Sequence, residues 1–256
     1  MENNLDYLKV YNTEHTKIRI GSINDGGYVI GENLKYDILI SCGISTDITF
    51  EDMFTNKYNI DCLAFDGTIG NLPHDDNNKI KLIKKNIGPV ENDKITNLKN
   101  VLINYDNIFL KMDIETYEFR WLEIMTDDEI NKFSQIVIEF HFPFSNPGFT
   151  DLDENISIDR KINCLRRLAN SHYLVHFHGN NCCGVQMYNN ITIPNVFECT
   201  YIRKDLCQTI SRNTTNIPDS LLDCKNVPRN PEIYLSGYPY TYQSELVPNP
   251  KKMVFR

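Results

Sequence analysis

NIFLKMDIETYEF, residues 107–119, is an apolar run that ends abruptly in acidic side chains. Such a run is typical of a buried parallel strand, and in open α/β sheets ligands bind at the carboxyl ends of these strands. Asp113 directly follows the run and is therefore expected on the rim of a ligand crevice. We expect Glu115 and Glu118, a little further on, to cap or solvate a following helix, because acids stabilise a helix N-terminus.

The same pattern recurs in DILISCG, residues 37–43, and in QIVIEFH, residues 135–141. In a parallel sheet these runs would deliver Gly43, Glu139 and His141 to the edge that carries Asp113. Three strand ends with these residue types predict a site and not only a core.

Strands and helices alternate across residues 37–142, which predicts a parallel sheet with right-handed crossovers. Thr126 with Glu129 three residues later forms a capping-box sequence at the start of one helix. The expected strands are residues 37–41, 61–65, 79–85, 108–113 and 135–142, and the expected helices are 47–56, 117–125 and 127–133.

The rest of the chain adds fewer regular elements, and we predict a single domain over residues 1–256. In the N-terminal segment, residues 1–36, DGGYVI predicts a turn and a short strand, either as a plain hairpin or as a lid against a ligand. Residues 157–206 predict a helix and two alternating strands, at 173–178 and 197–203, joined by a long loop over 179–195. Residues 207–256 are expected to form an irregular tail that packs on the body.

Composition narrows the class of protein. The 256-residue chain has a net charge of −8 and a pI near 5.3, which argues against nucleic-acid binding through its overall field. The eight cysteines include no Cys-x-x-Cys pair, so we expect reduced, buried thiols. No secretory signal and no membrane-length apolar run is visible, and these features predict a soluble, cytoplasmic protein with no membrane partner.

Two strand ends suggest a nucleoside ligand. The small-residue turn SCGISTD, residues 41–47, lets backbone N–H groups approach a ligand, and Asp66 follows the second strand, where an acid can bind ribose hydroxyls. A turn poor in glycine combined with this acid favours S-adenosylmethionine over NAD.

Five segments, in order, resemble the FkbM-type S-adenosylmethionine-dependent methyltransferases: DILISCGISTDITFED, CLAFDGT, FLKMDIETYEF, QIVIEFHF and HFHGNNC. The resemblance spans residues 19–206. It implies a class I methyltransferase, Rossmann-like α/β fold: a mostly parallel seven-stranded sheet with its last strand antiparallel and helices on both faces. It also implies methyl transfer to a hydroxyl of a sugar, nucleotide-sugar or glycan.

By the same resemblance, residues at the strand ends would bind the cofactor. The methionine portion would lie at the first turn, the ribose after the second strand and the adenine near the end of the third. The expected cofactor-binding residues are Ser41, Gly43, Ser45, Glu51, Asp66, Gly67, Asn86 and Asp113. One departure is Thr116, which stands where the family usually has glycine after its Asp-x-Glu.

Methylation of a hydroxyl requires removal of a proton, and Asp113, Glu139 and His141 are the candidate catalytic residues. Asp113 and Glu139 could instead hold Mg²⁺ or another divalent cation through oxygen ligands, with His141 or His178 as base. Both versions stay open, as do two other functions, an RNA ribose methyltransferase and a non-catalytic nucleoside-binding module. The oligomeric state is also open, with a homodimer among the options.

Overall fold

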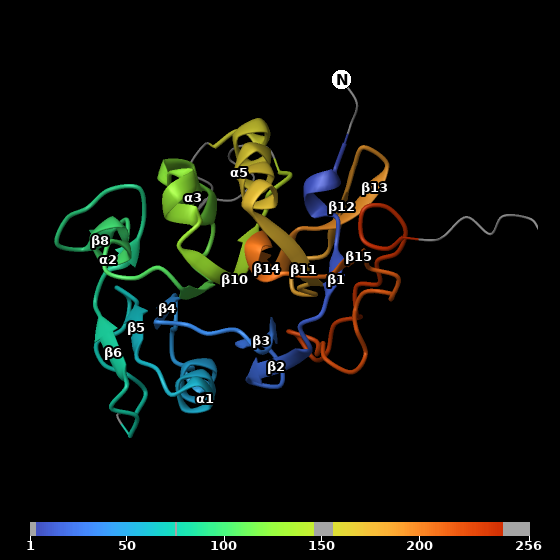
Figure 1. Ribbon diagram of the computed structural model, residues 1–256. Coiled ribbons are helices and arrows are strands. Elements are labelled where there is room, and N and C mark those ends of the chain that lie inside the picture. Colours follow the sequence, from blue (N-terminus) through green and yellow to red (C-terminus); the bar gives the residue numbers. More distant parts are fainter. Residues whose placement is uncertain (1–3, 75, 146–155, 243–256) are drawn as a thin grey trace, which may run out of the picture.

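A seven-stranded sheet forms the centre of the computed structural model, which describes residues 4–74, 76–145 and 156–242 (Figure 1). Five consecutive parallel strands are followed by β14, which is antiparallel to both of its neighbours, β10 and β11. In spatial order the strands are β6 (Ile80–Ile83), β5 (Cys62–Phe65), β4 (Ile38–Cys42), β9 (Ile108–Met112), β10 (Phe133–His141), β14 (Val196–Arg203) and β11 (His172–Gly179). The predicted mostly parallel α/β sheet with an antiparallel last strand is confirmed.

The central strands are apolar because they are covered on both faces. Every residue of β4, β9 and β10 is buried, as expected for parallel strands inside an α/β protein. The Lys-rich run at residues 79–85 instead supplies the edge strand β6, where Lys81 is exposed. Edge position and charge together explain its alternation, since an edge strand has one solvated side.

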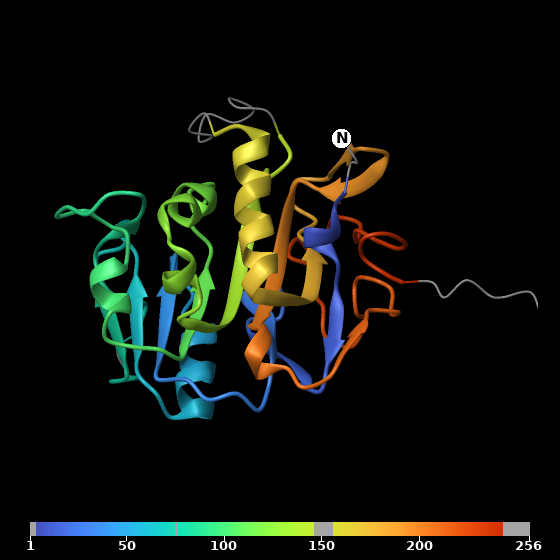
Figure 2. The same ribbon diagram turned by 45° about the horizontal axis from the view of Figure 1, so that its top comes forward.

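One face of the sheet carries the helices α3 (Glu118–Ile124), α4 (Asp127–Ile130) and α5 (Ile158–Ser171). Figure 2 shows α5 lying across this face. The apolar side chains that recur at helical spacing in α5, Ile162, Leu165 and Leu168, are buried against the sheet. The capping box predicted for α4 is present, since Thr126 Oγ1 accepts from the N–H of Glu129 and the Glu129 side chain accepts from the N–H of Thr126. α4 is shorter than predicted because β10 already begins at Phe133.

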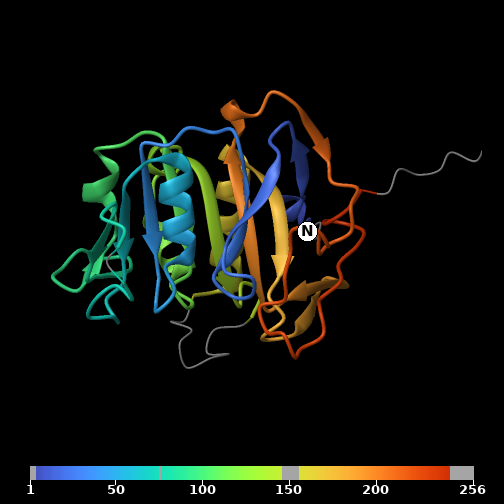
Figure 3. The same cartoon turned by 90° about the horizontal axis from the view of Figure 1, so that it is seen from below.

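The other face is covered by one helix, α1 (Thr49–Tyr58), and by a hairpin of β2 (Lys17–Gly21) and β3 (Gly27–Gly31) (Figure 3). The prediction of helices on both faces is therefore only partly right, because a hairpin takes the place of further helices over β10, β14 and β11. Gln135 fixes this hairpin to the sheet: its Oε1 accepts from the N–H of Gly31 at 2.7 Å, and its Nε2 donates to the Gly31 carbonyl at 3.0 Å.

Short elements complete the described chain. They are η1 (Asp6–Leu8), β1 (Tyr11–Thr13), β7 (Asn86–Ile87), β8 (Ile95–Thr96), α2 (Lys99–Leu102), β12 (Val185–Tyr188), β13 (Ile191–Pro194), η2 (Lys204–Leu206) and β15 (Ile210–Arg212). The predicted long loop over residues 179–195 is wrong in its second half, where β12 and β13 pair as a hairpin.

The C-terminal part is better ordered than its composition indicated. β15 pairs with β1, and Ile217 bridges to Leu235, so residues 207–242 pack along the β11 side of the sheet. The predicted tail is thus confirmed as packed on the body as far as residue 242. Residues 243–256 and 1–3 lie outside the described residues.

The cysteines divide into three groups. Cys42, Cys62, Cys164 and Cys199 are buried free thiols, as predicted. Cys207 and Cys224 are free thiols that are only partly buried. Cys182 and Cys183 are exposed and joined to each other by a disulfide in the segment before β12, so the prediction of buried, reduced thiols is wrong for this adjacent pair.

Candidate functional site

A cavity of about 420 Å³ opens at the carboxyl ends of β4, β5 and β9, a volume within the usual range of ligand sites. The chain continues from β4 to β5 on one side and places β9 on the other, so the cavity lies where the strand order reverses. Its walls come from the segments that follow each strand and from β7 and β8. The lining residues are Gly43, Ser45, Phe65, Asp66, Thr68, Asn86, Ile87, Ile95, Asp113, Ile114, Glu115 and Tyr117.

Gly43 allows the turn after β4 to pass against the end of β9. Its φ is +74°, and a Cβ at this position would lie 1.6 Å from the carbonyl oxygen of Asp113. The N–H of Asp113 in turn donates to the carbonyl of Cys42 at 3.0 Å. The expected residue Gly43 thus lines the cavity, and its physical role is to bring the backbones of two strand ends together.

Asp66, which also lines the cavity, joins the turn after β4 to the turn after β5. Its carboxylate accepts from the N–H of Ser45 at 2.8 Å and from the N–H and Oγ1 of Thr68 at 2.8 and 2.6 Å. Burial opposes its charge, but these hydrogen bonds outweigh that effect and lower the pKa of Asp66. The charged carboxylate of Asp66 is thus fixed at the cavity wall by both turns.

Two further predicted residues lie beside Asp66. Asn86 lines the cavity, and its Oδ1 accepts from the N–H of Gly67 at 2.9 Å. Gly67 itself supports the wall without lining it, since a Cβ there would approach Asn86 Oδ1 to 2.6 Å. Asn86 therefore fixes the turn that follows β5.

Ser41 and Glu51 do not line the cavity, contrary to the expectation that they contact a cofactor. Both are fully buried beneath the turn, where Ser41 Oγ donates to Glu51 Oε1 at 2.5 Å. Lys111 Nζ lies 3.7 Å from the same Glu51 oxygen and donates to the carbonyl of Gly43 at 2.8 Å. Side chains inside β4 and α1 point away from the strand end, so these residues support the turn from below.

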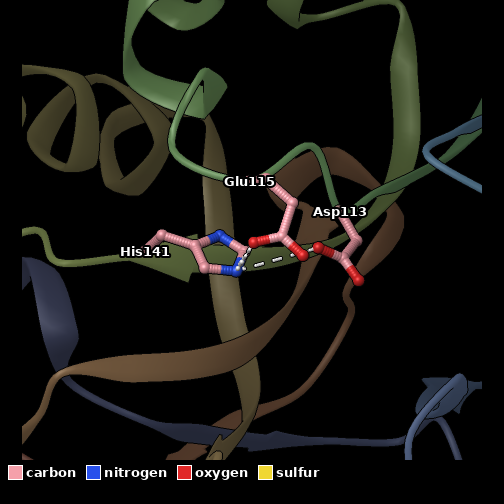
Figure 4. A group of neighbouring side chains, drawn as sticks. All are labelled: Asp113, Glu115 and His141. Carbon is pink, nitrogen blue, oxygen red and sulfur yellow. Dashed lines mark ion pairs between the residues drawn. The ribbon is translucent and has the colours of Figure 1, made fainter. Parts of the chain in front are cut away.

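A cluster of four carboxylates surrounds His141 next to the cavity. We call this the His141 cluster: His141, Asp113, Glu115, Glu118 and Glu139. His141 Nδ1 lies 3.0 Å from Glu118 Oε1, and His141 Nε2 lies 3.4 Å from Glu115 Oε2, 3.8 Å from Glu139 Oε1 and 3.9 Å from Asp113 Oδ1. Figure 4 shows Asp113 and Glu115 converging on Nε2. The three predicted catalytic residues are therefore brought together, along with two acids that had been assigned to a helix end.

The role of Glu118 in the His141 cluster was not predicted from the sequence. It is fully buried, and its Oε1 accepts from His141 Nδ1 and from the N–H of Thr116 at 3.1 Å. Glu115 and Thr116 adopt left-handed φ values of +54° and +82°, which fold the turn after β9 back toward β10. Thr116 thus adopts the conformation that glycine favours, where the family pattern has glycine. An acid in the first turn of a helix is common in any protein, so the sequence carried no signal for this contact.

The pKa values of three side chains in the His141 cluster are strongly shifted. Burial raises the pKa of Asp113 to about 6, and burial together with the nearby Asp113 charge raises the pKa of Glu139 well above its usual range. Burial opposes protonation of His141, but Glu118 and then Glu139 and Asp113 raise its pKa to about 10. Asp113 Oδ1 and Glu139 Oε2 are buried and have no hydrogen-bond partner among the described residues. Closely spaced groups with such shifted pKa values are typical of functional sites.

A second group, the His176–His178 cluster, lies further along the sheet and consists of His176, His178, Glu198, Asp223 and Glu232. His176 Nε2 pairs with Asp223 Oδ1 at 2.7 Å, while His178 Nδ1 lies 3.4 Å from Glu198 Oε2 and its Nε2 lies 3.5 Å from Glu232 Oε1. Both ring nitrogens of His178 face carboxylates, so the alternative base is enclosed. Asn180 connects the two regions, since its Nδ2 donates to Glu139 Oε1 at 2.8 Å.

The β2–β3 hairpin reaches the site through Tyr28, whose hydroxyl donates to Asp113 Oδ2 at 3.3 Å. Of the two interpretations of DGGYVI, the pairing of β2 with β3 supports the hairpin, and the Tyr28 contact places it against the ligand edge.

Comparison with known proteins adds little. No protein-family model and no curated protein matches the chain. A solved structure described as "Putative hemolysin from Streptococcus thermophilus" aligns with 73% of this chain and 79% of its own, at 13% identity and a TM-score of 0.37. At this TM-score the similarity carries no inference about fold or function. Within residues 4–74, 76–145 and 156–242, no helix has the length and apolarity needed to cross a membrane.

Proposed function

We propose that this protein is an S-adenosylmethionine-dependent O-methyltransferase that acts on a hydroxyl of a sugar, nucleotide-sugar or glycan. One observation carries the proposal: a cavity at the reversal of strand order is lined by Asp66 and by two residues of the His141 cluster, Asp113 and Glu115. The resemblance of the sequence to the FkbM-type enzymes supports it, and the seven-stranded sheet with its antiparallel last strand is the sheet that this resemblance implies.

The cavity walls suggest how a nucleoside donor would lie. Its adenosine end would contact Asp66 and Asn86, with Ile87 and Ile95 as apolar surface for the base. Its methionine end would pass the backbone of Gly43 and Ser45, which places the donated methyl group near Asp113. The binding determinants and the His141 cluster would then meet at the reacting atoms.

Such a donor supplies an activated methyl group, so the protein must position the acceptor and remove its proton. We assign proton removal to Glu139, with Asp113 and His141 beside it. Burial raises the pKa of both carboxyls, and a carboxylate with a raised pKa is a stronger base once it is ionised. Without a cation, the carboxylates around His141 raise its pKa to about 10, so we do not assign His141 as the base.

The other two functions have less support. An RNA ribose methyltransferase would need a basic channel, whereas the net charge is −8 and the described cavity is lined with acids. A non-catalytic nucleoside-binding module would not require five ionisable groups with three strongly shifted pKa values beside its cavity.

Calorimetric titration with S-adenosylhomocysteine tests the proposal. The wild-type chain is expected to bind one equivalent, and Ile95→Trp, which fills the cavity, is expected to abolish binding. Ile103→Trp is the matched control, because Ile103 is 75% exposed and lies outside the cavity. A methyl-transfer screen over sugars and nucleotide-sugars would follow. Absence of binding, or equal binding by Ile95→Trp, would refute the assignment of the cavity.

A further inference from the structure

Three residues of the His141 cluster have the geometry of a cation site. One ligand atom each from Asp113, Glu115 and His141 lies within 4.8 Å of the other two (Figure 4). Ligands bonded at about 2.1 Å to one cation lie no more than about 4.2 Å apart. The distances of 3.4 Å and 3.9 Å from His141 Nε2 to Glu115 and Asp113 already satisfy this limit.

Glu139 provides a second, independent observation. It is 3% exposed, its Oε2 has no hydrogen-bond partner among the described residues, and its Oε1 lies 3.8 Å from His141 Nε2. A buried carboxylate oxygen without a donor is costly, because its lost hydration is not replaced. Asp113 Oδ1, 3.9 Å from the same nitrogen, is also buried without a partner among the described residues. Two acids that flank His141 Nε2 thus each carry a buried oxygen without a donor.

Glu118 supplies the outer support that metal-binding histidines usually have. An ionised carboxylate can only accept, so the contact at 3.0 Å has His141 Nδ1–H as donor to Glu118 Oε1 and directs Nε2 toward Asp113 and Glu115. Glu118 is itself held by the N–H of Thr116. This carboxylate–histidine arrangement fixes the imidazole orientation before any ligand arrives.

We propose that Asp113, Glu115 and His141 bind a divalent cation of the Mn²⁺ or Mg²⁺ type, with Glu118 as the positioning residue behind His141. Glu115 thus takes the ligand position that sequence reasoning gave to Glu139, which remains free as the base. Two carboxylates and one imidazole leave coordination positions open, and Asp113 and Glu115 also line the cavity. The choice of acceptor rests on the proposed function. The open coordination positions select an acceptor that chelates the cation through two adjacent oxygens, such as a vicinal diol.

The His176–His178 cluster provides an internal control for this inference. Glu232 lies 3.5 Å from His178 Nε2, nearly the distance that separates Glu115 from His141 Nε2. His178 nevertheless has a separate carboxylate at each nitrogen, and three ligand atoms do not converge there among the described residues. Contact between a histidine and an acid alone therefore does not define the cation site.

Electron paramagnetic resonance of Mn²⁺ added to the metal-free full chain measures binding without any activity assay. One saturable site is expected. Glu115→Gln and Glu118→Gln should each raise the dissociation constant at least about tenfold, the lower end for ligand and second-layer changes. Glu232→Gln should stay within about twofold. Circular dichroism of each variant confirms that the fold is retained, which is expected for Glu115 because its side chain is 74% exposed.

No saturable Mn²⁺ binding up to millimolar concentration, or equal affinity in wild type and Glu115→Gln, would overturn the cation site. Titration with S-adenosylhomocysteine separates this outcome from failure of the proposed function. Mn²⁺ binding without nucleoside binding would leave the cation site and remove the methyltransferase. Nucleoside binding without Mn²⁺ binding would do the reverse. With both bound, equal methylation of a vicinal diol and of its mono-deoxy analogue would overturn the chelating acceptor.

Discussion

The His141 cluster and the His176–His178 cluster use the same residue types on the same sheet but differ in how histidines and acids are matched. In the His141 cluster one histidine faces four carboxylates, and three carboxylate oxygens are buried without a hydrogen-bond donor among the described residues. In the His176–His178 cluster two histidines face three carboxylates, and Asn226 donates to Glu198 at 2.6 Å.

The His141 cluster is also more open to solvent than the His176–His178 cluster. Asp113 and Glu115 of the His141 cluster line the cavity, whereas Asp223 and Glu232 come from the C-terminal part of the chain that covers β11 and β14. Excess negative charge beside a cavity indicates a place for a cation or a reacting proton. Matched charge under a covering segment indicates a stabilising role. Three substitutions, at Glu139, Asp223 and His178, can separate these two roles.

The largest effect is expected for turnover when Glu139 is changed. Glu139→Gln keeps the shape of the side chain and the acceptor for Asn180 but removes the base, so the methyl-transfer rate should fall by about 10²-fold or more. Affinity for S-adenosylhomocysteine should remain within a few-fold, because Glu139 does not line the cavity. Single-turnover assays measure the rate. Unchanged turnover in Glu139→Gln would mean that the His141 cluster has no more of a catalytic role than the His176–His178 cluster.

In the His176–His178 cluster, Asp223→Ala should lower stability instead. The substitution leaves His176 buried without its partner at 2.7 Å, which costs about 3 kcal/mol of unfolding free energy. For a chain of this size the melting temperature should fall by roughly 6–12 °C. Turnover at a temperature well below melting should match wild type. Asp223→Asn, which retains a neutral hydrogen bond, is the conservative control. A loss of turnover in folded Asp223→Ala would make this cluster functional too.

The pH dependence of stability offers a third test, through His178. Burial opposes its charge, but hydrogen bonds to Glu198 and Glu232 raise its pKa to about 10, above the unfolded value near 6.5. A raised folded pKa contributes stability that is complete below pH 6.5 and is lost as pH rises toward 10. The stability advantage of wild type over His178→Gln should therefore shrink by about 4 kcal/mol between pH 6 and pH 9.5. Urea unfolding at pH 6 and pH 9.5 measures it. A difference that stays constant with pH would mean that His178 is neutral.

The smallest expected effect is a gain in stability. In the presence of EDTA, Glu139→Gln should raise the unfolding free energy at neutral pH by about 1 kcal/mol, because it removes a buried, unsatisfied acid next to Asp113. This prediction gives the sharpest comparison of the two clusters, because Glu139→Gln should raise the free energy of unfolding and Asp223→Ala should lower it. Calorimetric melting of the two variants side by side checks this. If Glu139→Gln instead destabilised the chain, Glu139 would be a structural residue.

Much of the architecture was predictable because it depends on local pattern. The continuous apolar runs predicted β4, β9 and β10, since a strand buried on both faces has no polar positions. Helical spacing predicted α5, and the capping-box sequence predicted α4. The hairpin of β12 and β13 was missed, since the same composition suits a loop, and its pairing depends on a contact that spacing does not reveal.

The candidate site was predictable in part. Gly43, Asp66 and Asp113 were placed correctly at the cavity because position at a strand end follows from strand direction. Ser41 and Glu51 were misplaced because the face on which a side chain emerges depends on the neighbouring helix. Whether Asp66 binds a ribose, and which acceptor is used, remain predictions.

The sequence by itself determined the strands, the edge of the sheet at which ligands would bind, and the acids that end there, because hydrophobic periodicity and chain direction are local properties. Only the tertiary structure decided which acid faces which histidine. Glu115 and Glu118 reach His141 because a left-handed turn folds one strand end against the next. Asp223 and Glu232 reach His176 and His178 from about fifty residues away in the chain. Contacts of this kind depend on how separate segments pack, and no short stretch of sequence encodes them.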